Sequence, residues 1–399
     1  MSWFNYLFMG IDFNNTKVAF HLKSDSDLER AYFLFKMISI EPLVRIGTAA
    51  TNFALKAHLP VESLIRSTVF DHFCGGVSEF DCIPKINEMH KSHVYSVLDY
   101  SVEGKEDEAQ FDLALQKTLE LILFSKNNDA MPIAVFKPTG FGRFKIYQKV
   151  SEKIALSTSE SEEWSRIKER FNLVCASGKL NNIKILIDAE ESWIQKAVDD
   201  LILEMMQLYN KESVIVYNTL QAYRWDRLDY LKQIHLTSKK LNFKLGFKVV
   251  RGAYMEKERL RASKLGYKSP ICETKVITDA LFNDTIKFIL ENLNQIHPFI
   301  GTHNEESTSM AVHLMQAVKI SNNDTRVWFG QLYGMSDHIS YNLAENGYNV
   351  AKYVPFGPVK DVMPYLIRRA EENTSVAGQT SRELSLIKKE RKRRKSKEQ

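Results

Sequence analysis

Residues 248–259 read KVVRGAYMEKER, and this stretch decides the fold. The apolar residues Val249 and Val250 indicate a buried strand, which ends abruptly at the cation Arg251. The charged run 256–259 indicates the first turn of a helix. A strand that ends in polar side chains and turns into a helix is how an α/β barrel presents its active site. The plainer alternative is a strand end followed by a solvated helix start.

The same alternation continues on both sides of this stretch. Apolar runs of strand length alternate with longer helical stretches, which predicts parallel βαβ units. Eight such units predict a closed (β/α)8 barrel of the TIM type. An open doubly wound sheet is the alternative, but Gly140 and Gly142 form a lone GxG without the third glycine of a dinucleotide-binding turn. The predicted strands are 94–100, 132–138, 183–190, 213–222, 245–254, 299–304, 327–333 and 350–355.

A helical extension precedes the predicted barrel. Residues 25–70 are helical in pattern, with Ser24 as a candidate cap. Pro42 breaks the pattern, and a second helical stretch follows through Ile46 and Phe53. The predicted division of the chain is a helical segment that packs on the barrel (1–85), the barrel itself (86–380) and a basic, disordered tail (381–399).

The composition is that of a globular protein with a full core. Of the 399 residues, 44% are hydrophobic and 26% are charged. The four cysteines form no CxxC pair, so neither a zinc ribbon nor a redox dithiol is expected, and a reducing compartment is the default. No run approaches the roughly 18 apolar residues of a membrane-spanning helix. The apolar N-terminus lacks a cationic leader, so we expect an ordered start rather than a signal peptide.

Nearly every predicted strand ends in a polar or ionisable side chain. In a barrel, the carboxyl ends of all strands meet at one rim, so residues far apart in the sequence converge there. A single polar strand end often marks only the exit of the chain from the core, but the whole set indicates a site. The strand-end residues are Asp99, Lys137, Asp188, Glu190, Gln221, Arg251, Tyr254, Thr302, His303, Asn304, Gln331, Tyr333 and Tyr353.

A helix predicted over 364–376, with Pro364 in its first turn, follows the last strand. It carries Arg368 and Arg369, with Glu372 at positions i+4 and i+3 from them. Ordinary surface ion pairs are one interpretation. The other is a pair of guanidinium groups that clamps a substrate carboxylate, because the arginine fork binds carboxylate through two hydrogen bonds. The position near the rim favours the clamp.

Asp188, Glu190 and His303 suggest an alternative chemistry, a metal-dependent lyase or hydrolase. Strand alternation would place both carboxylates on one face. Sites of this kind usually add a second histidine or a bridging carboxylate, and none is near in the sequence, so no metal is expected. The non-enzymatic alternative is a basic-tailed binding protein built on a barrel.

Several motifs at these strand ends, taken together, resemble the proline dehydrogenase family over about residues 24–376. The resemblance implies a (β/α)8 barrel that holds FAD and oxidises L-proline to Δ1-pyrroline-5-carboxylate by hydride transfer to flavin N5. This is the first step of proline catabolism, and the electrons pass to a membrane quinone. The chain has no room for the aldehyde dehydrogenase domain of bifunctional relatives, so we expect a monofunctional enzyme. The motifs are IDAEES, VVRGAYMEKER, GTHNEES, GQLYGMSDH, KYVPFGPV and PYLIRRAEENTSV.

The resemblance also implies roles for individual residues. Arg368 and Arg369 would hold the proline carboxylate, and the aromatic Tyr353 is associated with proline over 4-hydroxyproline. Lys137 and Asp188 are candidates for the proton transfer, with a mutual ion pair as the alternative. The implied proline pocket is Lys137, Asp188, Tyr254, Leu332, Tyr353, Arg368 and Arg369, of which all but Leu332 and Tyr353 are candidate catalytic residues. The implied FAD contacts are Gln221, Lys248, Val250, Arg251, Gly252, Thr302, His303, Asn304 and Glu372.

The basic character of the chain lies in its last residues. Residues 388–399 carry eight Lys or Arg and two Glu, whereas the whole chain has a net charge of +5, so the remainder is close to neutral. Blocks of like charge are usually disordered. One hypothesis is that the tail holds a bacterial cytoplasmic enzyme at the inner face of the membrane, and a solubilising tail is the alternative. Nucleic-acid binding is not expected, because the neutral body offers no basic surface.

Overall fold

The computed structural model describes residues 10–40, 42, 44, 47, 65–100, 106–375 and 379–396 of the chain. Within these ranges, the side chains of residues 67, 370–375 and 379–380 are not described. The second helical stretch predicted through Ile46 and Phe53 lies outside the described residues.

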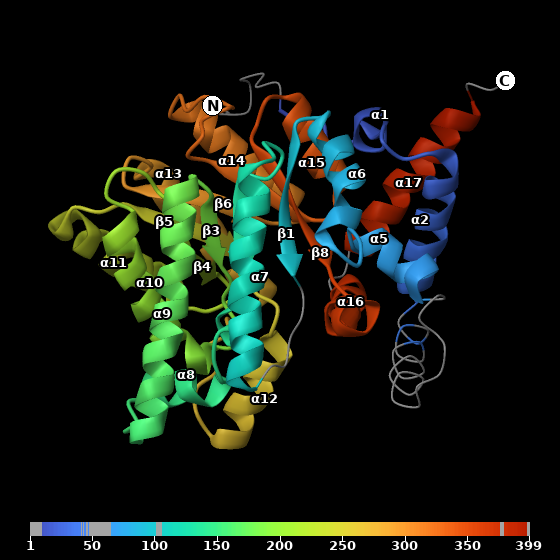
Figure 1. Cartoon of the computed structure of the whole chain (residues 1–399). Helices are drawn as coiled ribbons and strands as arrows, with labels where there is room; N and C mark the ends of the chain where they lie inside the picture. The colour runs from blue at the N-terminus through green and yellow to red at the C-terminus, as the bar shows by residue number, and fades with distance from the viewer. Residues whose placement is uncertain are drawn as a thin grey trace.

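Eight parallel strands form a closed barrel in which neighbours in sequence are neighbours in space (Figure 1). The strands are β1 (Val94–Tyr100), β2 (Ile133–Phe136), β3 (Lys184–Ile187), β4 (Val216–Gln221), β5 (Leu245–Val250), β6 (Ile296–Gly301), β7 (Trp328–Leu332) and β8 (Val350–Phe356). Pairing of β1 with β8, from Val94↔Val350 to Tyr100↔Phe356, closes the ring. The predicted (β/α)8 architecture is therefore confirmed.

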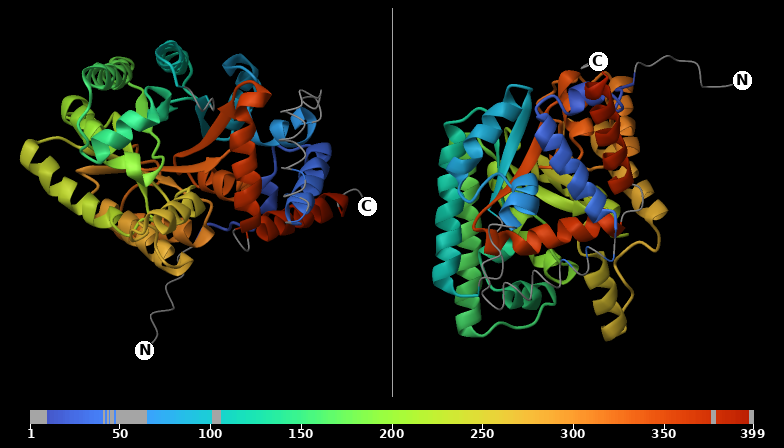
Figure 2. Two further views of the ribbon diagram at one scale, coloured as in Figure 1. Left: turned by 90° about the horizontal axis from the view of Figure 1, so that it is seen from below. Right: turned by 90° about the vertical axis from the view of Figure 1, so that its right-hand side faces the viewer.

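Helices alternate with the strands and surround the barrel (Figures 1 and 2). Before β1 lie α1 (Thr16–Ala19), α2 (Asp25–Ile38), the π-helical turn η1 (Arg66–Phe70), α5 (Asp71–Phe73) and α6 (Glu79–His90). Between the strands lie α7 (Glu108–Lys126), the 3-10 turn η2 (Pro138–Gly140), α8 (Phe144–Ser151), α9 (Thr158–Asn181), α10 (Ser192–Tyr209), α11 (Arg227–Leu241), α12 (Met255–Leu265), α13 (Lys275–Glu291), α14 (Glu305–Ala317) and α15 (Asp337–Glu345). After β8 follow α16 (Val359–Ser375) and α17 (Gln379–Lys395). None of the described helices combines the length and the hydropathy needed to cross a bilayer.

The strand side chains alternate between two cores, because successive residues of a strand point to opposite faces. Val97 and Phe299 lie in the cluster that fills the barrel interior. Leu98 and Ile300, one position further along, pack in the cluster beneath the helices. The interior is thus a packed core rather than a pore, and the open positions for a ligand are at the rim.

The rim lies at the lower end of the barrel in Figure 1, where the β1 arrow points and where α12 and α16 are found. The helix predicted over 364–376 begins earlier, at Val359. Pro364 therefore lies inside α16 and not in its first turn. The extra turn brings the helix start directly after β8.

The two ends of the described chain pack against each other. Ser24, the candidate cap in the sequence, is the N-cap of α2 and forms a capping box with Asp27. Its Leu28 and Phe35 form one buried cluster with Leu386 and Ile387 of α17. The further views in Figure 2 also show α2 and α17 side by side.

The prediction that residues 381–399 form a disordered tail is wrong for the described part of that segment, which forms α17. Charge repulsion is offset because acidic side chains pair with the basic ones. Glu390 is fully buried and accepts hydrogen bonds from Arg393 at 2.7 and 2.6 Å. Arg391 donates two hydrogen bonds of 2.7 Å to Glu29 on α2.

Candidate active site

A lysine–aspartate pair occupies the rim at the first two strands. Lys137 follows β2, and its Nζ donates to both carboxylate oxygens of Asp99 on β1, at 3.1 and 3.3 Å. The alternative in which Lys137 pairs with Asp188 is wrong, because Asp188 is paired with Lys248 instead. Asp99 was recognised in the sequence only as a polar strand end.

A second buried group joins three strands. Lys248 on β5 donates hydrogen bonds to the Asp188 carboxylate, just after β3, and to the Tyr353 hydroxyl of β8, the latter at 3.1 Å. The Lys248 ammonium also lies 4.9 Å from the centre of the Tyr353 ring. Burial, together with the nearby carboxylates Asp188 and Asp99, raises the pKa of the Tyr353 phenol well above its ordinary value, so the phenol is neutral. Residues assigned to proline and to the flavin thus form one connected group.

Arg251 is held in a single orientation at the end of β5. Its Nε donates to Asp279 at 2.7 Å, Nη1 to the Thr302 hydroxyl at 2.8 Å and Nη2 to the Ser307 hydroxyl at 2.9 Å. The guanidinium also lies over the Phe282 ring, 4.5 Å from its centre. Three hydrogen bonds and a ring contact fix this cation where β5 and β6 end.

The His303 ring is buried and uncharged. Burial, reinforced by the positive charges of Lys352 and Arg369, lowers its pKa to about 3. A hydrogen bond of 2.9 Å joins its Nδ1 to the Ser336 hydroxyl. The neighbouring Asn304 accepts a backbone N–H of α14 at 2.8 Å and so caps that helix.

Gln221, the last residue of β4, has an unused acceptor. Its Nε2 donates to the Glu190 carbonyl at 2.8 Å, whereas its buried Oε1 has no hydrogen-bond partner among the described residues. A buried acceptor without a partner costs about 1–3 kcal/mol, so a ligand N–H at this place would be favourable.

The turn after β5 requires glycine. Gly252 has φ +128°, and a Cβ there would lie 2.5 Å from the Tyr223 ring. Val250, two residues before Gly252, ends β5, and its carbonyl accepts the Ala222 N–H at 2.7 Å. Tyr254 lies at the N-cap of α12 and is half-buried.

The two arginines of α16 sit close to the rim. Arg369 is buried, and its guanidinium lies 5.0 Å from the centre of the Tyr365 ring. Arg368 is half-buried beside it, as is Leu332 at the end of β7. The Glu372 side chain, assigned to the flavin, lies outside the described residues.

The residues of the alternative metal site make separate contacts. Glu190 accepts the Thr139 N–H at 3.0 Å and its hydroxyl at 2.7 Å, whereas Asp188 and His303 each bond to a different side chain. Burial raises the pKa of Glu190 to about 7, although the hydrogen bonds from Thr139 oppose this. Across the described ranges, no cluster of three or more potential metal ligands is present.

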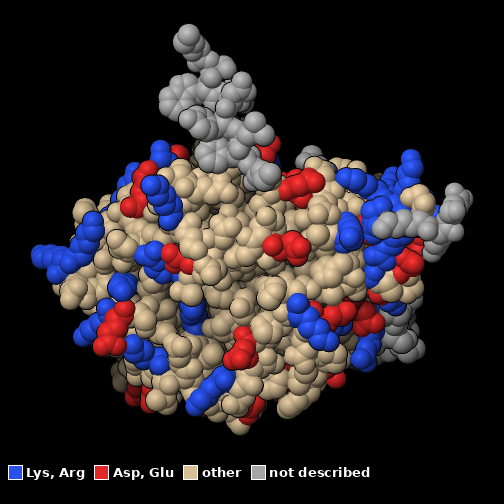
Figure 3. All heavy atoms as spheres, turned by 90° about the horizontal axis from the view of Figure 1, so that it is seen from above, with Lys and Arg blue, Asp and Glu red and all other residues tan. Residues whose placement is uncertain are grey.

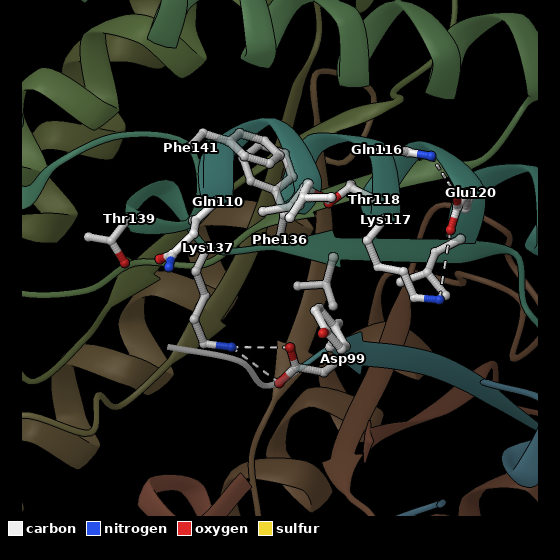
Figure 4. A pocket seen from close by; sticks show the side chains of 16 residues that line it. Asp99, Gln110, Gln116, Lys117, Thr118, Glu120, Phe136, Lys137, Thr139 and Phe141 are labelled. Carbon is white, nitrogen blue, oxygen red and sulfur yellow. Dashed lines mark hydrogen bonds and ion pairs between the residues drawn. The ribbon is translucent and has the colours of Figure 1, made fainter. Parts of the chain in front are cut away.

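A pocket of about 380 Å³ opens beside the Lys137–Asp99 pair, between α7 and the first two strands (Figure 4). Phe136 and Phe141 stack in its wall, with ring centres 4.6 Å apart. Its lining comes from β1, β2, α7 and the turn after β2, so the pocket lies beside the rim and not over the centre of the barrel.

Comparison with protein families and with known proteins gives a consistent result. A family model described as proline dehydrogenase matches residues 82–382. The chain is 38% identical to the carbapenem antibiotics biosynthesis protein CarD of Pectobacterium carotovorum subsp. carotovorum, over 83% of this chain and 85% of that protein. It is 32% identical to the mitochondrial proline dehydrogenase 2 of Arabidopsis thaliana, over 92% of this chain and 87% of that protein.

Solved structures show the same fold. The crystal structure of proline utilization A from Bdellovibrio bacteriovorus inactivated by N-propargylglycine aligns with a TM-score of 0.70 over 92% of this chain, at 19% identity. This chain spans 37% of the length of that one. At this identity the likeness concerns the fold alone.

Proposed function

The chain belongs to the proline dehydrogenase family and is an enzyme of proline oxidation, the first step of proline catabolism; from this premise we propose that it converts L-proline to Δ1-pyrroline-5-carboxylate with FAD as its cofactor. When bound, FAD would supply the hydride acceptor, at flavin N5. The observation that carries the proposal is the convergence of the family's motif residues at one rim. There Lys248, Asp188 and Tyr353 form a single hydrogen-bonded group.

The rim residues fit a flavin dinucleotide. Oε1 of Gln221 has no hydrogen-bond partner among the described residues, so it suits a ligand N–H such as those of the flavin ring. Arg251 and Lys248 are cations placed by their own hydrogen bonds, and they suit phosphate groups and negative charge on a reduced ring. His303 is neutral, so it can offer a hydrogen bond without adding charge.

The remaining residues would bind and orient proline. Arg368 and Arg369 would hold the carboxylate, because guanidinium groups bind carboxylates bidentately. Tyr353, Tyr254 and Leu332 would shape the pocket for the apolar ring of the substrate and exclude water from it.

The amine must lose a proton before hydride can leave the neighbouring carbon. Asp188 and Lys137 are the two groups we propose for holding that proton. Each is already paired, Asp188 with Lys248 and Lys137 with Asp99. In either pair the carboxylate would take the proton, Asp188 directly or Asp99 by way of Lys137, and the positive charge lost by the substrate amine would then rest on the paired lysine.

We further propose a membrane quinone as the final electron acceptor, met at the inner face of a bacterial membrane. Lys388, Lys392 and Lys395 are exposed on α17 at helical spacing. In Figure 3 basic side chains gather at the edge of the molecule beside the C-terminal end of this helix. Such residues contribute about 1 kcal/mol each near anionic lipid.

The reaction is tested with the purified holoenzyme, L-proline and an artificial electron acceptor. The expected product is Δ1-pyrroline-5-carboxylate, formed in equal amount to the two-electron acceptor reduced. 4-Hydroxyproline should react more slowly, because Tyr353 would narrow the proposed pocket. Consumption of acceptor without this product, or no turnover of L-proline by flavin-loaded protein, would overturn the proposal.

A further inference from the structure

We propose that the C-terminal helix α17 positions the cofactor site, through a chain of contacts from Glu383 to Ser336 and from Ser336 to His303. The inference rests on the proposed function, because it is there that His303 is assigned to FAD. It gives a role in the site to a segment whose sequence indicates only a basic tail.

The first link is a buried carboxylate on α17. Glu383 is 3% exposed, and its Oε1 accepts the backbone N–H of Ser336. Ser336 lies in the loop between β7 and α15 and adopts the left-handed conformation, φ 52° and ψ 41°. That conformation costs a non-glycine residue about 1–2 kcal/mol and persists where surrounding contacts hold it. Glu383 supplies such a contact.

The second link runs from Ser336 to the imidazole. The Ser336 hydroxyl lies 2.9 Å from Nδ1 of His303. A hydrogen bond at Nδ1 fixes the orientation of the imidazole ring, whichever of the two partners donates. The backbone placement of Ser336 therefore decides how His303 faces a ligand.

A parallel set of contacts holds the start of α14, two residues after His303. Arg382, next to Glu383 on α17, donates to both carboxylate oxygens of Glu305, at 2.6 and 3.1 Å. Nε2 of His338 lies 3.0 Å from Glu305 as well. Burial alone would raise the pKa of Glu305, but the hydrogen bonds from His338 and Arg382 outweigh it and lower the pKa to about 2. Glu305 begins α14, two residues after His303, so α17 holds the loops that follow both β6 and β7.

The positioning contacts are separable from the packing of the helix. Leu386 and Ile387 bury α17 against α2. Glu390, two turns beyond Glu383, is equally buried but bonds to Arg393 and Arg394 of its own helix. Glu390 is therefore a matched control, a buried glutamate on the same helix that does not touch the rim.

The test compares Glu383→Leu with Glu390→Leu in the flavin-loaded protein. Both substitutions should lower the Tm. Only Glu383→Leu should weaken FAD binding, by about tenfold, which is the lower end of the loss seen when a supporting contact of a metal-ligating histidine is removed, and shift the flavin midpoint potential. Equal FAD dissociation constants and equal potentials in the two variants would overturn the inference. A wild-type protein that binds no FAD would instead overturn the proposed function.

Ser336→Ala tests the route through the hydroxyl and serves if Glu383→Leu does not fold. It removes one oxygen and leaves the backbone N–H, so the potential should shift while the Tm changes by only a few degrees. The double variant Glu383→Leu/Ser336→Ala should bind FAD no more weakly than Glu383→Leu alone. Additive losses would show that Glu383 does not act through Ser336, and would contradict the proposed chain of contacts.

Discussion

The lysines Lys137 and Lys248 at the rim each form an ion pair with one carboxylate. Lys137 pairs with Asp99, and Lys248 pairs with Asp188. All four side chains are largely buried, and removing one member of a buried pair typically costs about 3–5 kcal/mol because the other charge is left uncompensated. The sequence predicts that these residues reach the rim. It does not predict the pairing, which depends on which strands are neighbours and how far each side chain reaches.

Arg368→Lys and Arg369→Lys should each raise the KM for L-proline. A lysine keeps the charge but cannot form the bidentate contact, and a lost hydrogen bond to a charged group is worth about 1.5–3 kcal/mol, or roughly 10- to 150-fold in kcat/KM. The flavin content should remain that of the wild type. Steady-state kinetics and the flavin absorbance measure both effects. Unchanged kcat/KM in both variants would contradict the carboxylate clamp.

Glu190→Gln should change how stability depends on pH. Burial raises the pKa of Glu190 from its ordinary value of 4.5 to about 7. The folded protein therefore holds a proton that the unfolded chain releases between these values, so the wild type loses stability as pH rises from about 4.5 to about 7. The full loss is about 3 kcal/mol.

The amide of the Glu190→Gln variant does not titrate. The Tm of the variant minus the Tm of the wild type should therefore be several degrees higher at pH 8 than at pH 5. Calorimetry in matched buffers measures this difference. The same Tm difference at both pH values would show that Glu190 titrates normally in the folded protein.

At the scale of elements, the strands were predictable because their apolar runs are continuous and bounded by polar residues. The residues at which the strands and helices end were harder to predict. The predicted strand 245–254 stops at Val250 in the structure, because the turn at Gly252 takes a positive φ that no strand accommodates. The helix of the two arginines likewise begins five residues before the expected Pro364.

Helix α17 shows where charge composition misleads. Its basic run predicts disorder, yet Glu383, Leu386, Ile387 and Glu390 recur at intervals of three and four and form one buried face. The signal was present in the sequence, but it depends on α2 as a partner, more than 350 residues away along the chain.

Ile387→Ala should lower the free energy of unfolding by about 2–5 kcal/mol, because it leaves a cavity between α17 and α2. Lys388→Ala, the adjacent exposed position, should change it by no more than about 0.5 kcal/mol. Urea denaturation measures both. If the two substitutions have the same small effect, α17 is not docked in solution.

At the scale of the whole molecule, the ends of the described chain close over each other beside the barrel. This arrangement places Lys388, Lys392 and Lys395 of α17 on the outside, whereas Arg382 and Glu383 contact the loops after β6 and β7. One helix would thus contact both the membrane and the cofactor site under the proposals made above.

Lys388→Glu/Lys392→Glu should weaken binding to vesicles that contain anionic lipid by at least about 30-fold, since each lysine contributes about 1 kcal/mol near such a surface. The matched control is Lys240→Glu/Lys287→Glu, which makes the same charge change on α11 and α13. Co-sedimentation at low salt measures the partition. Equal losses in both variants would indicate a general charge effect and remove α17 as the contact surface.

The most direct test of the central claim is the visible spectrum of the purified holoenzyme without oxygen, before and after addition of L-proline. The account predicts a flavin absorption band that bleaches with L-proline and changes far less with 4-hydroxyproline. A flavin band that L-proline leaves unchanged, or a colourless protein that takes up no added FAD, would contradict it.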